Sequence, residues 1–172
     1  MRSHFENVVR LLKLEAGAIL RASDRLDEAR IERAVNLIAN CESKVIVMGT
    51  GKSGVIAQKI AQTLTSTGTV AIFVHPSDAL HGSLGVITKG DVVIALSNSG
   101  ETDEILALIP ALKSREVPII SIIGNPDSTL SRQSDVVLDA SVDREACPLD
   151  LAPTTSTTVA LAIGDGLAMT LM

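Results

Sequence analysis

Apolar residues recur along this chain at two spacings, one typical of amphipathic helices and the other of buried strands. Near the N-terminus they return every three or four positions over residues 5–20 and again over residues 31–38, which predicts two helices. Short runs rich in Val and Ile follow and predict buried parallel strands. These five runs are residues 44–48, 70–74, 92–96, 118–123 and 136–138.

Helical patterns separate the predicted strands, at residues 53–66, 102–115 and around 127–133. Strands that alternate with helices favour right-handed crossovers, so we expect an α/β fold. The predicted architecture is a three-layer, doubly wound, five-stranded parallel sheet with flavodoxin-like strand order 2-1-3-4-5.

A last apolar helix is predicted over residues 154–172, directly after Pro153. No Gly, Asn or Pro closes it. We therefore expect either that the natural chain continues past this helix or that a partner subunit covers its end.

Two loops rich in glycine and hydroxyl groups each lie between a predicted strand and a predicted helix: GTGKSG at residues 49–54 and SNSGET at residues 97–102. Backbone N–H groups at a helix start are unpaired and carry the positive end of the helix dipole, so they can bind a phosphate dianion without a metal. In a 2-1-3-4-5 sheet the two loops are neighbours at the topological switch point. The sequence therefore predicts a small phosphorylated ligand.

The first loop also matches G-x-G-x-x-G through Gly49, Gly51 and Gly54, which raises the possibility of a dinucleotide site. Such a site needs an acidic residue at the end of the second strand, and residues 72–75 are Ile, Phe, Val and His. A nucleotide-binding P-loop fails as well, because Ile46 occupies the position of its first glycine. Neither NAD nor ATP is favoured.

Lys52 places a cation where these backbone N–H groups converge, with Gly51 in the tight turn and Ser53 adding a hydroxyl. The alternative is a solvated lysine on a structural turn. In the second loop Ser97, Ser99 and Thr102 supply three hydroxyls, whereas a helix cap needs only one. This excess favours a phosphate cradle over capping alone.

Four ionisable residues are candidates for acid/base chemistry. Glu104 lies in the first turn of a predicted helix, where a carboxylate can act as a base or merely interact with the helix dipole. His75 and His81 flank a polar turn after the second strand, so at least one is a candidate acid or base. Glu145 lies in the loop after the fifth strand, where a solvated glutamate is equally common.

Composition narrows the function classes. A chain of 172 residues is the size of one domain, which we place at residues 1–172, and its net charge of −5 disfavours nucleic acid. Cys41 and Cys147 show neither metal-ligand spacing nor a disulfide framework, and Cys147 is not expected to be a nucleophile. We expect no metal, no cofactor and no membrane span, and a location in the cytoplasm.

Taken together, the motifs resemble those of the arabinose 5-phosphate isomerase family. The motifs that carry the resemblance are residues 49–54, 66–69, 73–76, 81–82, 97–102, 145–148 and 151–158. The resemblance implies a sugar isomerase (SIS) fold and metal-independent interconversion of D-ribulose 5-phosphate and D-arabinose 5-phosphate through an enediol. This reaction feeds synthesis of the sugar Kdo for lipopolysaccharide or capsule.

The resemblance also implies roles for individual residues. Lys52, His81, Glu104 and Glu145 match the family's catalytic residues. The phosphate-binding loops correspond to Ser53, Ser97, Ser99 and Thr102. It further implies a homotetramer with active sites near subunit interfaces, and this chain holds the SIS domain without the two CBS domains that most members carry. Two alternatives stay open: a hexulose 6-phosphate isomerase of the same fold, and a non-catalytic SIS module that senses a sugar phosphate.

Overall fold

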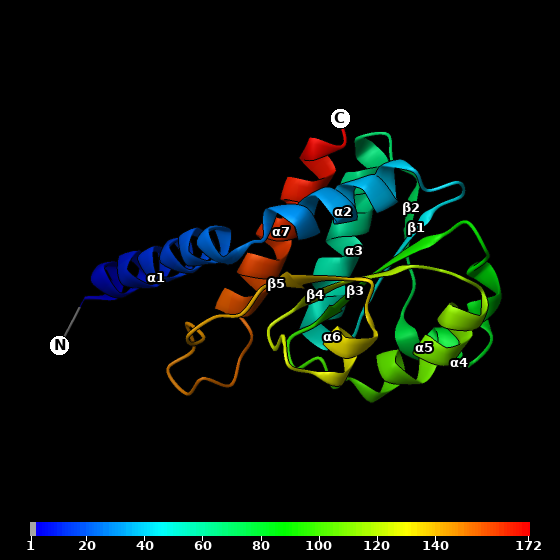
Figure 1. Ribbon diagram of the computed structural model, residues 1–172. Coiled ribbons are helices and arrows are strands. Elements are labelled where there is room, and N and C mark those ends of the chain that lie inside the picture. Colours follow the sequence, from blue (N-terminus) through cyan, green and yellow to red (C-terminus); the bar gives the residue numbers. More distant parts are fainter. Residues whose placement is uncertain (1–2) are drawn as a thin grey trace.

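The computed structural model describes residues 3–172 and is built around one parallel five-stranded sheet (Figure 1). Its strand order is β2-β1-β3-β4-β5, which confirms the predicted 2-1-3-4-5 order. The strands are β1 (Val45–Gly49), β2 (Ala71–Phe73), β3 (Val92–Ser97), β4 (Ile119–Ile123) and β5 (Val136–Asp139). The helices are α1 (His4–Arg25), α2 (Glu28–Ala39), α3 (Gly51–Ser66), α4 (Pro76–Leu80), α5 (Asp103–Ser114), α6 (Thr129–Gln133) and α7 (Thr155–Thr170), with a 3₁₀ helix at Ser83–Val86.

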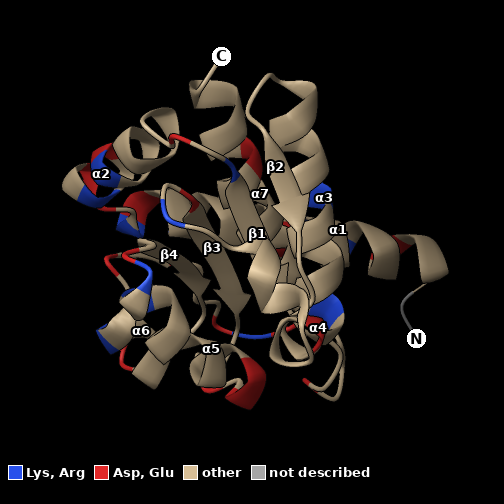
Figure 2. Cartoon of the chain, turned by 90° about the vertical axis from the view of Figure 1, so that its right-hand side faces the viewer, with Lys and Arg blue, Asp and Glu red and all other residues tan. Residues whose placement is uncertain are grey.

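The helices form two layers, one on each face of the sheet. Successive strand residues point to opposite faces, so β1 gives Val45 and Val47 to a core with α2, α3 and α7. Ile46 and Met48 from the same strand pack into a second core with α4, α5 and α6. Figure 2 shows α5 and α6 on the side of the sheet opposite α3 and α7, as in a doubly wound fold.

Helix α7 packs closely on α3 because a glycine lies at their contact. A Cβ atom at Gly164 would overlap the buried side chain of Ile60. An ion pair between Lys59 of α3 and Asp165 of α7 flanks this contact. The close approach carries the first turn of α7 to the same edge of the sheet as the first turn of α3 (Figure 1).

The two N-terminal helices are present, and α1 extends away from the rest of the chain (Figure 1). A capping box fixes its first turn: the Ser3 hydroxyl accepts from the Glu6 N–H at 3.1 Å, and the Ser3 N–H donates to the Glu6 carboxylate at 2.8 Å. The apolar side chains of Phe5, Val8 and Leu12 are exposed on α1. Within residues 3–172, no helix combines the length and apolar character needed to cross a membrane.

The segment after β2, predicted from the sequence as a polar turn, contains the short helix α4. Pro76 occupies its first position, and the Nδ1 atom of His75 accepts a hydrogen bond from the Ser77 N–H at 3.3 Å. Five residues complete little more than one turn, so no apolar periodicity marks this helix in the sequence.

Candidate functional site

A cavity of about 150 Å³ opens at the carboxyl ends of β1, β3 and β4, where ligands bind in doubly wound folds. The start of α3, the β3–α5 loop and the start of α7 supply most of its polar lining. The lining residues are Thr50, Lys52, Ser53, Ile56, Leu96, Ser97, Asn98, Ile122, Gly124, Ala140, Pro153, Ser156, Thr157 and Ala160. Of the predicted site residues, Lys52, Ser53 and Ser97 therefore share this cavity.

The first turn of α3 presents hydrogen-bond donors to the cavity. Thr50 is the N-cap and makes no side-chain capping bond, and the Thr50 carbonyl already accepts from the Gly54 N–H at 3.0 Å. The N–H groups of the first helical residues consequently have no partner within α3. Gly51 adopts a φ of +53°, a region that favours glycine, and turns the chain tightly from β1 into the helix.

The β3–α5 loop is held by its own hydroxyl groups. The buried Ser97 Oγ accepts from the Gly100 N–H at 2.9 Å and lies 2.8 Å from the Thr102 Oγ1. The Ser99 Oγ accepts from the Glu101 N–H at 3.2 Å. Ser99 and Thr102 thus shape the loop, and neither lines the cavity.

Asn98 reaches the cavity because Gly124, at the end of β4, leaves space beside it. A Cβ atom at Gly124 would lie 2.7 Å from the Asn98 carbonyl oxygen and would collide with the Asn98 side chain. Asn98 was not among the predicted site residues. Its position in the SNSGET loop is the sequence signal that could have found it.

Glu145 caps the first turn of α7 behind the cavity wall. Its Oε2 accepts from the backbone N–H groups of Thr154 at 2.8 Å and of Ser156 at 3.2 Å, and the hydroxyls of both residues also donate to the carboxylate. Burial raises the pKa of Glu145, but these hydrogen bonds outweigh burial and hold the pKa below its ordinary value. The carboxylate is therefore ionised at neutral pH and touches the cavity only through Ser156.

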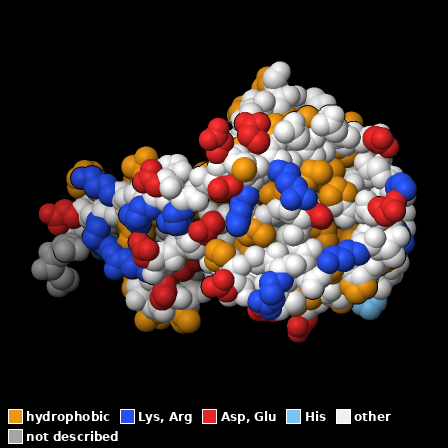
Figure 3. Space-filling model, in the orientation of Figure 1, with side chains coloured by type: hydrophobic (Ala, Val, Ile, Leu, Met, Phe, Trp, Pro, Cys, Tyr) orange, Lys and Arg blue, Asp and Glu red, His pale blue; other side chains and the backbone are white. Residues whose placement is uncertain are grey.

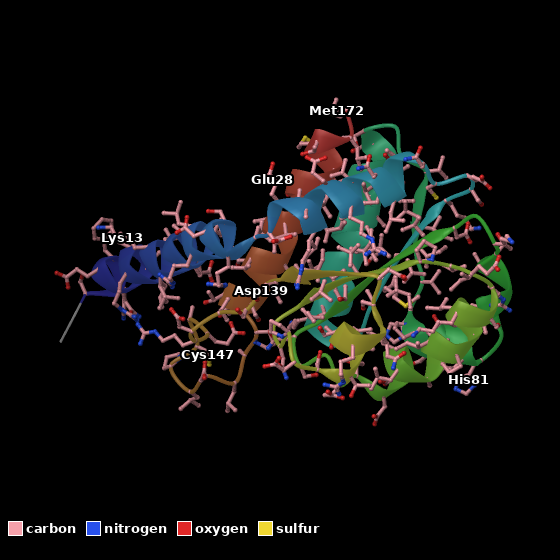
Figure 4. All side chains as sticks on the ribbon, in the orientation of Figure 1. Lys13, Glu28, His81, Asp139, Cys147 and Met172 are labelled. Atoms are coloured by element: carbon pink, nitrogen blue, oxygen red, sulfur yellow. The ribbon has the colours of Figure 1, made fainter. Side chains whose placement is uncertain are left out.

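The other candidate acid/base residues lie outside the cavity lining. Glu104 is partly buried in the first turn of α5. His75 serves as the N-cap of α4, and His81 is exposed at the end of that helix. Figure 4 shows His81 at the opposite side of the molecule from Cys147, which follows Glu145 closely in the chain.

The Cys147 thiol lies in a turn that stabilises its charged form. Backbone N–H groups of Ala152, Leu151 and Leu149 point toward the sulfur and lower the pKa of the Cys147 thiol. No such environment was expected from the sequence, because the turn lies in an irregular segment. The thiol does not line the cavity.

The charges around the site are few. Within residues 3–172, no group of three or more His, Cys, Asp or Glu side chains is arranged to hold a metal. Lys52 is the cation in the cavity lining. On the face seen in Figure 3, Lys and Arg side chains alternate with Asp and Glu rather than forming a patch of one sign.

Comparisons with known proteins agree with this geometry. The SIS domain model matches residues 37–170. The chain is 49% identical to a Francisella tularensis protein named arabinose 5-phosphate isomerase KdsD, over 100% of this chain and 53% of the relative. It is 48% identical to an Escherichia coli protein named arabinose 5-phosphate isomerase KpsF, over 96% of this chain and 51% of the relative. The chain thus spans about half the length of the curated relatives it matches.

A solved structure is similar over nearly its whole length. It is the c3406 protein of E. coli CFT073 in complex with arabinose 5-phosphate, with a TM-score of 0.86 and 39% identity. The alignment covers 99% of this chain and 92% of that one.

Proposed function

Because the chain belongs to the SIS domain family, we propose that it is an aldose–ketose isomerase that interconverts D-ribulose 5-phosphate and D-arabinose 5-phosphate. The observation that carries this proposal is the cavity between the start of α3 and the β3–α5 loop, in which Lys52, Ser53 and Ser97 come together. Relatives named arabinose 5-phosphate isomerase, at 48% and 49% identity, support the choice of substrate.

In this proposal the phosphate binds at the first turn of α3. The unpaired N–H groups there and the Lys52 ammonium are donors to the phosphate oxygens, and Ser53 adds a hydroxyl. Ser97 closes the other side from β3, and its loop is already held in one conformation by the Ser97–Gly100 hydrogen bond of 2.9 Å. A preorganised loop reduces the ordering cost of binding.

Isomerisation requires a base that moves a proton between C1 and C2 while the substrate passes through an enediol. We assign this role to Glu104, which follows the phosphate-binding loop in the first turn of α5. Lys52 would stabilise the negative oxygen of the enediolate. Glu145 and His81 would serve ring opening and proton transfer between oxygens.

The base assignment is tested by Glu104→Gln. Removing the carboxylate should slow isomerisation and exchange of the aldose C2 proton with solvent by about 100- to 10,000-fold, the usual contribution of a positioned base. Proton NMR of D-arabinose 5-phosphate in D₂O with each protein follows both reactions. Exchange at the unaltered rate in Glu104→Gln would remove Glu104 from this role.

The assembly is part of the proposal. We infer a homotetramer, supported by the exposed apolar side chains of α1 and by an apolar groove of about 270 Å³ between α1, α2 and α7. His81 is exposed and lies outside the cavity lining of its own chain, so we assign it to the cavity of a neighbouring copy. The proposed site of action is the cytoplasm, where the product would supply Kdo synthesis.

A further inference from the structure

The α7 wall of the cavity carries two hydroxyl groups whose protons are already used elsewhere. Ser156 is 5% exposed, and its hydroxyl donates to the Glu145 Oε1. The Thr157 hydroxyl donates to the Thr154 carbonyl oxygen at 2.8 Å. Ser156 and Thr157 line the cavity, whereas Glu145 and Thr154 do not. Since a hydroxyl has one proton, both oxygens face the cavity as acceptors only.

The α3 wall has the opposite character. Lys52 carries three N–H donors and no acceptor, and the first N–H groups of α3 are unpaired within the helix. The cavity therefore has donors along α3 and acceptors along α7. A phosphate dianion has only acceptor oxygens, whereas a sugar hydroxyl can donate.

We propose that Ser156 is a substrate-orienting residue, which accepts a hydrogen bond from a sugar hydroxyl and so places the carbon chain of the sugar phosphate along α7 with its phosphate at α3. This proposal rests on the proposed function, because it specifies how the same cavity holds its substrate.

The carboxylate behind Ser156 strengthens this arrangement. An ionised Glu145 binds the Ser156 proton firmly, so the hydroxyl gains nothing by turning toward the cavity. The same negative charge repels a phosphate from the α7 wall. Both effects favour a ligand with an anionic end and a hydroxyl-bearing end over a bare anion in that position.

The test compares two probes, D-arabinose 5-phosphate and inorganic phosphate, by isothermal titration calorimetry with the full chain. Ser156→Ala should weaken binding of the sugar phosphate by about tenfold, since a substrate donor loses its acceptor. Binding of inorganic phosphate should change by less than about twofold. Ser53→Ala should weaken binding of both probes.

Thr158→Val is the matched control, because its hydroxyl lies on the same helix, donates to the Thr154 carbonyl at 2.9 Å and does not line the cavity. Circular dichroism checks that each variant folds. If Ser156→Ala does not fold, Thr157→Val tests the same wall with the same two probes.

The outcomes separate the two proposals. Equal weakening of both probes in Ser156→Ala would make Ser156 a phosphate ligand, and no change in either would remove it from the site; each result overturns the substrate-orienting role alone. A wild-type chain that binds and converts no sugar phosphate overturns the proposed function, and the role of Ser156 falls with it.

Discussion

At the scale of single residues, the carboxylate of Glu145 ties a loop to a helix. The hydroxyl side chain of Thr154, the N-cap of α7, makes no capping bond, and Glu145 supplies the acceptor from nine residues away. An unfilled helix start of this kind leaves backbone N–H groups without a partner. Loss of such a cap costs about 1 kcal/mol of stability.

This cap should make stability depend on pH. The pKa of Glu145 is lowered in the folded chain, so its contribution is fully present above the ordinary glutamate pKa and is lost as the pH falls through the folded value. Glu145→Gln should unfold at a lower temperature than the wild type at pH 7, and the two curves should converge below about pH 4. Thermal unfolding followed by circular dichroism between about pH 3 and pH 7 measures this.

Glu32→Gln, a change at an exposed carboxylate of α2, is the control and should follow the wild type over the range from neutral pH down to about pH 4. A constant difference in melting temperature between Glu145→Gln and wild type at every pH would show that the charge of Glu145 does not stabilise α7.

At the scale of elements, the contact between α3 and α7 positions two walls of the cavity relative to each other. Gly164 faces the buried Ile60, and a methyl group there has no free space. Gly164→Ala should therefore destabilise the chain by about 1–3 kcal/mol, the usual cost of overpacking a core. The shift in the urea denaturation midpoint measures this cost.

Gly166, two residues further along α7, is a matched control. A Cβ atom at Gly166 meets nothing within 4 Å, so Gly166→Ala should be neutral or stabilise the helix by up to about 1 kcal/mol. If both alanines behave alike, the close contact at Gly164 does not limit the packing of α3 on α7.

The elements also show what the sequence could predict. Apolar runs located all five strands, because a strand buried on both faces is apolar at nearly every position. The SNSGET and GTGKSG loops followed from the strand order. The approach of Gly124 to Asn98 could not be predicted, since it joins loops after two different strands.

Pairing across the irregular segment at residues 146–153 was equally hidden from the sequence. That segment has no periodicity, so nothing in the sequence indicated that Glu145 would meet Ser156 or that backbone N–H groups would surround Cys147. The TTST run at residues 154–157 predicted a helix start, but its hydroxyls point in directions that only the folded chain defines.

At the scale of the whole molecule, the proposed site is incomplete within one chain. The cavity brings together Lys52, Ser53 and Ser97, while His81 lies exposed beyond its lining. The protruding α1, with Phe5 76% exposed and Leu12 63% exposed, offers an apolar surface for a second copy. Assembly of copies would therefore bury α1 and could bring His81 to another chain's cavity.

Mixing two inactive variants tests whether His81 acts across an interface. If it acts in a neighbouring cavity, a mixed pair of His81→Ala and Glu104→Gln chains holds one site with both residues intact and one with neither. Random reassociation in equal amounts makes half of the pairs mixed, so about one quarter of wild-type activity should return. Each variant alone should stay inactive. Recovery is measured by isomerase assay after the chains are dissociated in mild denaturant and reassembled together. If His81 acts within its own chain, every site lacks one residue or the other and no activity returns.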